Sequence, residues 1–322
     1  VSLTREMIQI PPFEKLPLQK DGPPGNAWGL FGDNDQCGML NRLTPEVISA
    51  ASQEIRDGVR ISTDLPLDFM SKPCFGRAAF EQTIRNKAPR SVNDDTLHFN
   101  TQISSQWDGF RHYGYQASKK YYNGHTLNDF LTTNINGIHA WVENGGVVGR
   151  GVLLDYSSWA EAKNIKIDHF STHEISATTL QEIAASQETE LKEDDILFIR
   201  SGWVQAFTKL SQEQATALAD LQSPPAIGIE SSDQTLRWLW DTGFAAIAGD
   251  MPSMEAWPCK NTQFWLHEWL LAGWGMPIGE LFDLERLSEE CQRRGRYSFF
   301  FSSMPLKVPG GVASPPNGVA IL

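Results

Sequence analysis

Short apolar runs recur along the chain, each bounded by polar or glycine-containing segments. Runs of this kind, rich in isoleucine, leucine and phenylalanine, are typical of strands that are buried on both faces of a sheet. We expect buried strands at residues 152–155, 196–200, 245–248 and 297–301. The alternating segment 60–67, with a proline near its end, predicts another strand.

Helix signals lie between these strands. Thr44 precedes Pro45 and an apolar stretch, which predicts a short helix over 44–55 with the threonine as its cap. Capping boxes of the form S/T-x-x-E/Q predict three further helix starts, at Thr179/Glu182, Ser211/Gln214 and Ser231/Gln234. Apolar patterning also predicts helices at 263–271, ended by Gly273, and at 284–294, with Leu284, Leu287 and Cys291 inward. Strands that alternate with helices indicate an α/β fold, with a mixed β-sheet core flanked by helices.

The chain divides into an arm and one large domain. Residues 1–27 contain several prolines and predict an extended N-terminal arm that wraps the surface or a partner subunit. Residues 28–322 suit a single α/β domain. Within it, the polar segment 77–95 predicts a flexible loop near the mouth of a pocket. The glycine-rich segment 145–151 lacks the spacing of a phosphate-binding loop and predicts turns before a buried strand.

The composition of the chain argues against several classes of binding partner. The chain has 322 residues, 41% of them hydrophobic, which is enough for a sizeable core, and a formal net charge of −12. This negative charge argues against nucleic acid or an anionic membrane as partner. The four cysteines lie far apart without a C-x-x-C pair, so neither a zinc cage nor a disulfide framework is indicated. With no signal pattern and no long apolar run, we expect a cytoplasmic protein.

The candidate chemistry is concentrated in residues 97–112. Polar side chains occupy every second position from His98 to Asp108, and such spacing puts them on one face of a strand. Asp108 offers an anionic oxygen to a divalent cation, and His112 titrates near neutrality and is suited to general acid/base catalysis. A structural interpretation stays open: a strand with one solvated face, in which Asp108 caps a turn and His112 packs between aromatic rings.

The spacing of Gln102, Gln106, Asp108 and His112 is similar to the H-x-G-T-H-x-D-x-P-x-H motif of the metal-dependent cyclase superfamily, which includes kynurenine formamidases and isatin hydrolases. The resemblance extends from about Trp28 to the C-terminus, and the local Ser-Gln-Trp-Asp-Gly form resembles a divergent branch of that superfamily. It implies the cyclase/kynurenine formamidase-like fold. It also implies that Asp108 binds metal and that His112 is the catalytic acid/base.

The same resemblance implies the remaining metal ligands. Gln102 and Gln106 stand where the motif has metal-binding histidines, and His267 and Glu280 fall where related formamidases have distal ligands. Neutral amide oxygens suit Mn²⁺ or Mg²⁺ better than Zn²⁺, although Zn²⁺ stays an alternative. In a second interpretation the glutamines bind the substrate directly in a site without metal, and His267 is a core residue.

Other residues are candidates for substrate binding. Trp107, Phe110 and Tyr113 are suited to line a pocket for a flat or aromatic compound, although packing in the core is the alternative. Asp250 and Glu255 follow a predicted strand, at the edge where α/β pockets form, or else cap the next turn.

Together these features predict a metal-dependent hydrolase that cleaves an amide, imide or lactone bond of a small, aromatic or cyclic metabolite, as in secondary metabolism. A cyclase or dehydratase that uses the same residues and a metal-free small-molecule binding protein are the alternatives. The resemblance also implies a homodimer or homotetramer.

Overall fold

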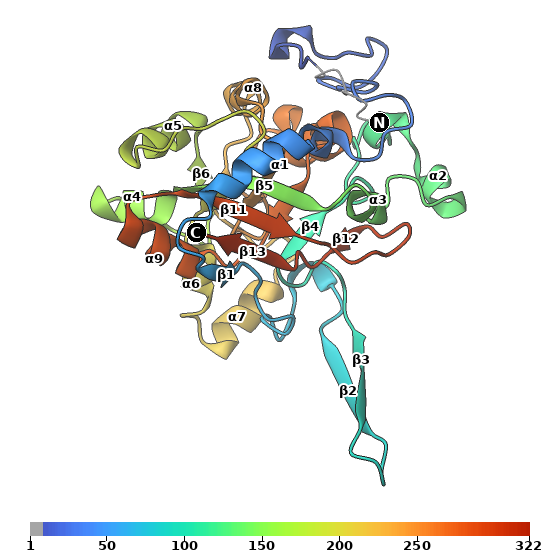
Figure 1. The fold of residues 1–322 in the computed structure, drawn as a ribbon, viewed down its shortest axis with the longest axis vertical. Helices are drawn as coiled ribbons and strands as arrows, with labels where there is room; N and C mark the ends of the chain where they lie inside the picture. The colour runs from blue at the N-terminus through green and yellow to red at the C-terminus, as the bar shows by residue number, and fades with distance from the viewer. Residues whose placement is uncertain (1–8) are drawn as a thin grey trace.

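A nine-stranded mixed sheet forms the centre of the protein in the computed structural model, which describes residues 9–322. The strands follow the order β1-β13-β11-β5-β7-β9-β10-β4-β12, and helices flank the sheet (Figure 1). Strands β5, β7, β9 and β10 are parallel, and their neighbours on both sides are antiparallel. The predicted α/β fold with a mixed sheet is confirmed.

The strands are β1 Arg60–Ser62, β2 Glu81–Asn86, β3 Asn93–His98, β4 Gln106–Asp108, β5 Val147–Asp155, β6 Glu174–Ile175, β7 Ile196–Arg200, β8 Gly228–Ile229, β9 Ala246–Gly249, β10 Ile278–Glu280, β11 Ser298–Ser303, β12 Ala313–Ser314 and β13 Gly318–Ile321. The α-helices are α1 Pro45–Ala51, α2 Leu127–Thr132, α3 His139–Glu143, α4 Tyr156–Ala162, α5 Ala177–Ser186, α6 Trp203–Phe207, α7 Gln212–Ala219, α8 Asp233–Thr242 and α9 Glu285–Arg294. The 3₁₀ turns are Phe13–Lys15, Gly38–Arg42, Ser52–Glu54, Cys74–Gly76, Tyr122–Gly124 and Thr262–Phe264, and Glu268–Trp274 is a π-helix, η7.

The apolar runs predicted as strands are all in the sheet, and β7 has the predicted bounds. Strand β5 is longer than predicted because it includes the glycine-rich segment 147–151. A Cβ at Gly151 would lie 2.3 Å from the Phe299 ring of β11, so a glycine is needed where this ring crosses β5. Such a glycine belongs to the strand rather than to a turn.

The residue at which each helix begins is set by the side chain that caps its N-terminus. The Thr44 side chain accepts a hydrogen bond from Val47 N, and the Ser211/Gln214 capping box is present, as predicted. The other two boxes were misplaced, because Ser176 and Ser232 are the N-caps of α5 and α8. The helix predicted over 263–271 is confirmed only in part: Thr262–Phe264 is a 3₁₀ turn, and the helical residues that follow include the π-helix η7, which continues past the predicted stop at Gly273.

The predicted loop over 77–95 is correct only for residues 77–80 and for the turn at 87–92. Strands β2 and β3 pair in full register from Glu81 opposite His98 to Asn86 opposite Asn93, and the hairpin projects from the body (Figure 1). Every residue of both strands is exposed. Because neither face is buried, the sequence lacks the alternation of apolar residues that usually identifies a strand.

The single strand that the alternation from His98 to Asp108 predicts is not present. The segment begins in β3 and turns at its centre, so that only Gln106–Asp108 joins the main sheet as β4. His98 therefore lies on the exposed hairpin, while Gln102, Gln106 and Asp108 are buried. The tertiary path of the chain, rather than strand parity alone, decides which polar residues share an environment.

The described part of the arm packs on its own chain. Phe13 contacts the rings of Trp269 and Trp274, and its N–H donates to Asp241 Oδ1 over 3.0 Å. The backbone N–H of Ala27 donates to Gly273 O over 2.9 Å. The arm thus covers η7, the element that follows His267. Residues 1–8 of the predicted arm lie outside the described residues.

Candidate metal centre

The register of β4 and β10 brings three polar side chains together. Gln106 lies directly opposite Glu280, and Asp108 is two residues further along β4, so all three side chains share one face of the sheet. Gln106 Nε2 donates to Glu280 Oε2 over 2.8 Å. All three residues are buried. The antiparallel pairing therefore places two carboxylates and an amide in one water-excluded cluster.

His267 enters this cluster from the residue before η7. Its Nδ1 lies 2.7 Å from Glu255 Oε1, and the same oxygen accepts a hydrogen bond from Trp265 Nε1 over 2.6 Å. Its Nε2 faces Glu280 Oε1 at 3.3 Å and Asp108 Oδ2 at 3.9 Å. A carboxylate on one ring nitrogen orients an imidazole whose other nitrogen binds a metal. Glu255 is placed to orient His267 in this way.

His112 reaches the cluster through a tight turn after β4. The N–H of His112 donates to Gly109 O over 2.9 Å, and His112 Nε2 then lies 3.9 Å from Asp108 Oδ2. Gln102 lies between them: its Nε2 donates to Asp108 Oδ1 over 2.7 Å and is 3.0 Å from His112 Nδ1. In this arrangement Gln102 presents its amide nitrogen and fixes the orientation of both partners.

The electrostatics of the cluster follow from its burial. Burial raises the pKa of Asp108 and lowers the pKa of His112, although each partially stabilises the charged form of the other. Burial alone would also lower the pKa of His267, but the carboxylates of Glu255 and Glu280 outweigh it and raise this pKa well above its usual value. Three buried carboxylates thus share a site with two imidazoles.

The donor set fits a divalent cation. Asp108 Oδ2 and Gln106 Oε1 are buried and have no hydrogen-bond partner within residues 9–322. One ligand atom from each of Asp108, His112 and His267 lies within 4.8 Å of the others. Buried oxygens without a donor are costly unless a cation or water satisfies them. A carboxylate oxygen, an amide oxygen and imidazole nitrogens are therefore available together to bind one ion.

Three of the residues predicted for the pocket lie elsewhere. Trp107 points to the opposite face of β4, where it packs against Phe282 and donates to Ser303 Oγ over 2.9 Å. Phe110 is buried against Tyr122 and Trp141. Asp250 accepts hydrogen bonds from Ser201 N and Oγ and from Gly202 N. The structure does not bring these three side chains to the cluster.

Tyr113 does lie beside it, with its ring 5.3 Å from the His267 ring and 5.4 Å from the Trp265 ring. Arg77 was not among the residues predicted for the site, yet its guanidinium donates to Gln102 O at the edge of the cluster. No motif or spacing includes this arginine, and it lies in the segment predicted as a loop. Only the folded path of residues 74–77 shows its position.

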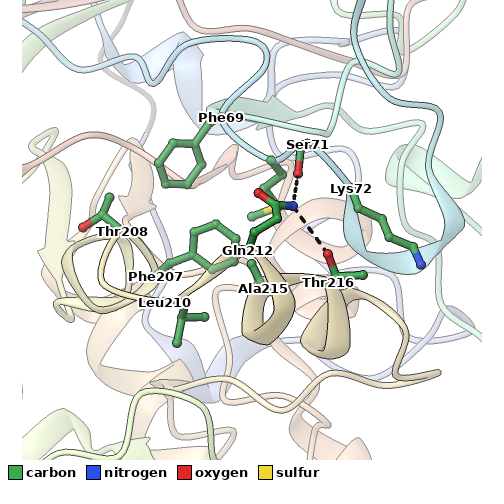
Figure 2. Close-up of a pocket in the computed structure, with 10 residues that line it drawn as sticks. Phe69, Ser71, Lys72, Phe207, Thr208, Leu210, Gln212, Ala215 and Thr216 are labelled. Carbon is green, nitrogen blue, oxygen red and sulfur yellow. Dashed lines mark hydrogen bonds between the residues drawn. The ribbon is translucent and has the colours of Figure 1, made fainter.

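A cavity of about 240 Å³ lies elsewhere, between α7 and the segment 69–72 (Figure 2). Phe69 and Phe207 form its apolar side, and Gln212 Nε2 donates to Ser71 Oγ over 2.7 Å. None of its lining residues is a histidine, cysteine, aspartate or glutamate. This cavity therefore lacks the groups that the chemistry predicted from the sequence requires.

An α/β protein with a carboxylate–imidazole cluster on its central sheet is the class that these observations define. The family described as "Putative cyclase" matches residues 36–256. The chain belongs to this cyclase family. No curated protein sequence is significantly similar to it, and no helix in residues 9–322 is both long and apolar enough to cross a membrane.

Solved structures share the fold. A structure described as a novel cyclase is 30% identical, with a TM-score of 0.81 over 92% of this chain and 100% of that chain. Isatin hydrolase A from Labrenzia aggregata is 18% identical, with a TM-score of 0.57 over 87% of this chain and 98% of the other. Isatin hydrolase A from Ralstonia solanacearum is 14% identical, with a TM-score of 0.59 over 86% and 97%. At these lower identities the likeness establishes the fold alone.

Proposed function

We propose that this protein is a metal-dependent hydrolase that cleaves an amide, imide or lactone bond in a small cyclic or aromatic compound. The observation that carries the proposal is the buried Asp108 Oδ2, which lacks a hydrogen-bond donor and faces His112 and His267 at 3.9 Å each. Membership of the cyclase family and the fold shared with isatin hydrolases support the same reaction class.

In this proposal Asp108, His267 and the Gln106 amide oxygen would hold a divalent cation, and Glu280 lies beside them. Such an ion polarises a carbonyl group and lowers the pKa of bound water. Glu255 fixes the His267 ring through the hydrogen bond at Nδ1, so Nε2 faces Asp108 and Glu280 and would be the nitrogen that binds the ion. The mixture of oxygen and nitrogen donors favours Mn²⁺ or Mg²⁺, with Zn²⁺ as the alternative.

His112 is the general base of the proposal. Burial lowers the pKa of this imidazole, so the ring is neutral near pH 7 and is able to accept a proton from a water molecule. Gln102 Nε2 contacts both His112 and Asp108, and it keeps the base and the anionic ligand in fixed relative positions. The proton taken from water is then available to the leaving nitrogen or oxygen.

The test is turnover by protein purified without chelator. Isatin, phthalide and 2-acetamidobenzoate represent cyclic amides, lactones and open amides, and product formation is followed with added Mn²⁺, Mg²⁺ or Zn²⁺ and with EDTA. We expect metal-dependent hydrolysis of at least one class. His112→Ala should lower this turnover by about 10²–10⁴ with the metal still bound, because general-base catalysis has that magnitude. Loss of metal in the variant would make His112 a ligand, and unchanged turnover would exclude both roles.

A metal-free binding protein is the second candidate, and the Gln102 amide nitrogen inside the cluster favours it. An N–H at this position satisfies Asp108 Oδ1 without a cation. Metal analysis and calorimetry with Mn²⁺ and Zn²⁺ separate the two candidates. If the protein binds neither ion and has no metal-dependent turnover, the result favours the metal-free binding protein over the hydrolase. The cyclase or dehydratase alternative predicts ring closure or loss of water without net hydrolysis.

We also propose a homodimer or homotetramer. An isolated two-stranded hairpin is marginally stable in water, yet β2 and β3 pair fully while exposing Ile84 and Leu97. Contact with a second copy would cover these side chains. Light scattering at micromolar concentration should give at least twice the mass of the chain, and a monomer would contradict the proposal. The cytoplasmic location stays a prediction.

A further inference from the structure

Arg77 lies at the edge of the metal centre, and most of its N–H groups are available to a ligand. A guanidinium group carries five N–H donors, and one of them bonds to Gln102 O. Within residues 9–322 no carboxylate forms an ion pair with Arg77. The positive charge of Arg77 nevertheless lowers the pKa of both Asp108 and His112, which places it close to the cluster.

The other arginines that are at least partly buried differ in this respect. Arg150 pairs with Glu54 and Asp195, and Arg200 pairs with Asp155 and Glu285. Arg111 has no carboxylate partner, but its N–H groups bond to four backbone carbonyls, those of Ile135, Phe130, Gly310 and Thr133. Folding therefore satisfies these guanidinium groups, whereas most of the Arg77 donors stay available to a ligand.

Aromatic rings continue from Arg77 around the cluster. The Arg77 guanidinium lies over the Phe75 ring at 5.3 Å, and the Phe75 ring is 6.0 Å from Trp257. Trp257 lies 6.2 Å from Trp265, and Trp265 lies 5.4 Å from Tyr113. We call these five residues the rim. Tyr113 adjoins His112 at 6.0 Å, and Gln102 joins His112 back to Arg77, so the rim closes into a ring beside the metal centre.

The conformation of the rim also differs from that of ordinary core packing. Phe75 has a φ of 61°, in the left-handed region that bulky residues rarely adopt, and the residue is 38% exposed. The other rim residues are partly exposed, whereas Asp108 and His267 are buried. Partly exposed rings around a buried polar cluster are typical of a binding-site entrance.

We propose that the rim selects a flat aromatic substrate that carries a carboxylate, with Arg77 binding the carboxylate and the rings of Phe75, Trp257, Trp265 and Tyr113 packing against the aromatic part. This inference rests on the proposed hydrolase function and names its substrate class. A guanidinium binds a carboxylate through two parallel hydrogen bonds, which orients as well as attracts it. Because the protein carries a net charge of −12, an anionic substrate needs such a local cation.

The test compares two probes that differ in one carboxylate, 2-acetamidobenzoate and acetanilide. Calorimetry measures the affinity of the metal-loaded protein for each, so the result does not depend on turnover. We expect the wild type to prefer 2-acetamidobenzoate. Arg77→Met should weaken the binding of 2-acetamidobenzoate about tenfold to hundredfold, because a hydrogen bond between charged groups contributes that much to the affinity. Acetanilide binding should change little.

Three further variants keep the test falsifiable. Arg77→Lys keeps the charge without the planar fork and should retain part of the preference. Arg85→Met makes the same change on the exposed hairpin and should have no effect. Phe75→Leu should weaken both probes alike, by about twofold to tenfold, since it removes aromatic contact without removing charge.

A wild-type protein that binds both probes equally or binds neither, or an Arg77→Met variant that keeps the preference, overturns the inference. A carboxylate preference that depends on Arg77 in a protein without hydrolytic activity would support the rim and reject the hydrolase proposal. Hydrolysis of neutral amides without a carboxylate preference would support the hydrolase proposal and reject the rim.

Discussion

Two buried aspartates on the same sheet have opposite surroundings. Asp155, at the end of β5, accepts hydrogen bonds from Ser158 N and Oγ, from Arg200 and from Ser288. Asp108, at the end of β4, accepts one from Gln102 and leaves Oδ2 without a donor. Burial alone would raise both pKa values, but Arg200 and its neighbours lower that of Asp155, whereas the pKa of Asp108 stays raised.

The difference separates a structural carboxylate from one that is open to a ligand. In the Asp155 network each charge and polar group finds a partner within the chain, so the network holds β5, α4 and α9 together. In the Asp108 cluster carboxylates outnumber the groups that neutralise them, and oxygens stay unpaired. Since an unpaired buried oxygen costs free energy, the cluster fits a site completed by a cation.

The largest expected effect comes from Asp108→Asn. The amide keeps an oxygen for Gln102 but removes the anionic ligand, so we expect Mn²⁺ binding to be lost in calorimetry and turnover to fall by about 10³ or more. The free energy of unfolding should stay the same or increase, because a buried charge is removed. A variant that is simply unfolded, or one that still binds Mn²⁺ normally, would contradict the comparison.

Asp155→Asn should have the opposite consequences. Removing one partner of a buried ion pair leaves the other charge uncompensated, and Arg200 keeps only Glu285. We expect the free energy of unfolding, measured with urea, to fall by about 3 kcal/mol. The folded fraction should bind Mn²⁺ like the wild type. If metal affinity falls with stability unchanged, the two aspartates do not have separate roles.

Replacing Gln102 and Gln106 together by histidine sharpens the metal side of the comparison. Imidazole suits Zn²⁺ better than an amide does, so the double variant should bind Zn²⁺ about tenfold more tightly or better, and its preference for Mn²⁺ should decrease. Calorimetry with both ions measures this change. An unchanged zinc affinity would mean that neither glutamine contacts the ion.

A smaller effect is expected at Asp64, a third shielded carboxylate with an unpaired oxygen. Burial raises its pKa to about 6, while Gly318 N donates to its other oxygen. Between about pH 4 and pH 6 the unfolded chain loses this proton before the folded protein does, so stability falls as pH rises through this window. Asp64→Asn should therefore raise the free energy of unfolding by about 2–3 kcal/mol at pH 8, because the pKa is raised from 3.8 to about 6, and by little at pH 4. Urea unfolding at both pH values measures this difference. We expect Asp64→Asn to bind Mn²⁺ like the wild type, so this variant is the matched control for Asp108→Asn.

The sequence determined the elements that rely on local signals. The buried strands β7, β9 and β11 follow from apolar runs, and the caps at Thr44 and Ser211 follow from side chains that reach their own helix ends. The motif at 102–112 also identified Asp108, His112 and Gln102, which the structure brings together. These features depend on residues close in sequence, so a pattern is enough to find them.

Only the tertiary structure decided the rest of the site. The β4–β10 register joins Gln106 to Glu280, the turn at 99–105 separates His98 from Gln102, and the path before η7 brings His267 onto Glu255. Arg77 reaches the site from a segment whose polar pattern predicted a loop. Such contacts join residues far apart in the chain, and they form because the packing of the sheet and of η7 outweighs the local conformational preferences of these segments. The spacing of residue types along the sequence therefore does not predict them.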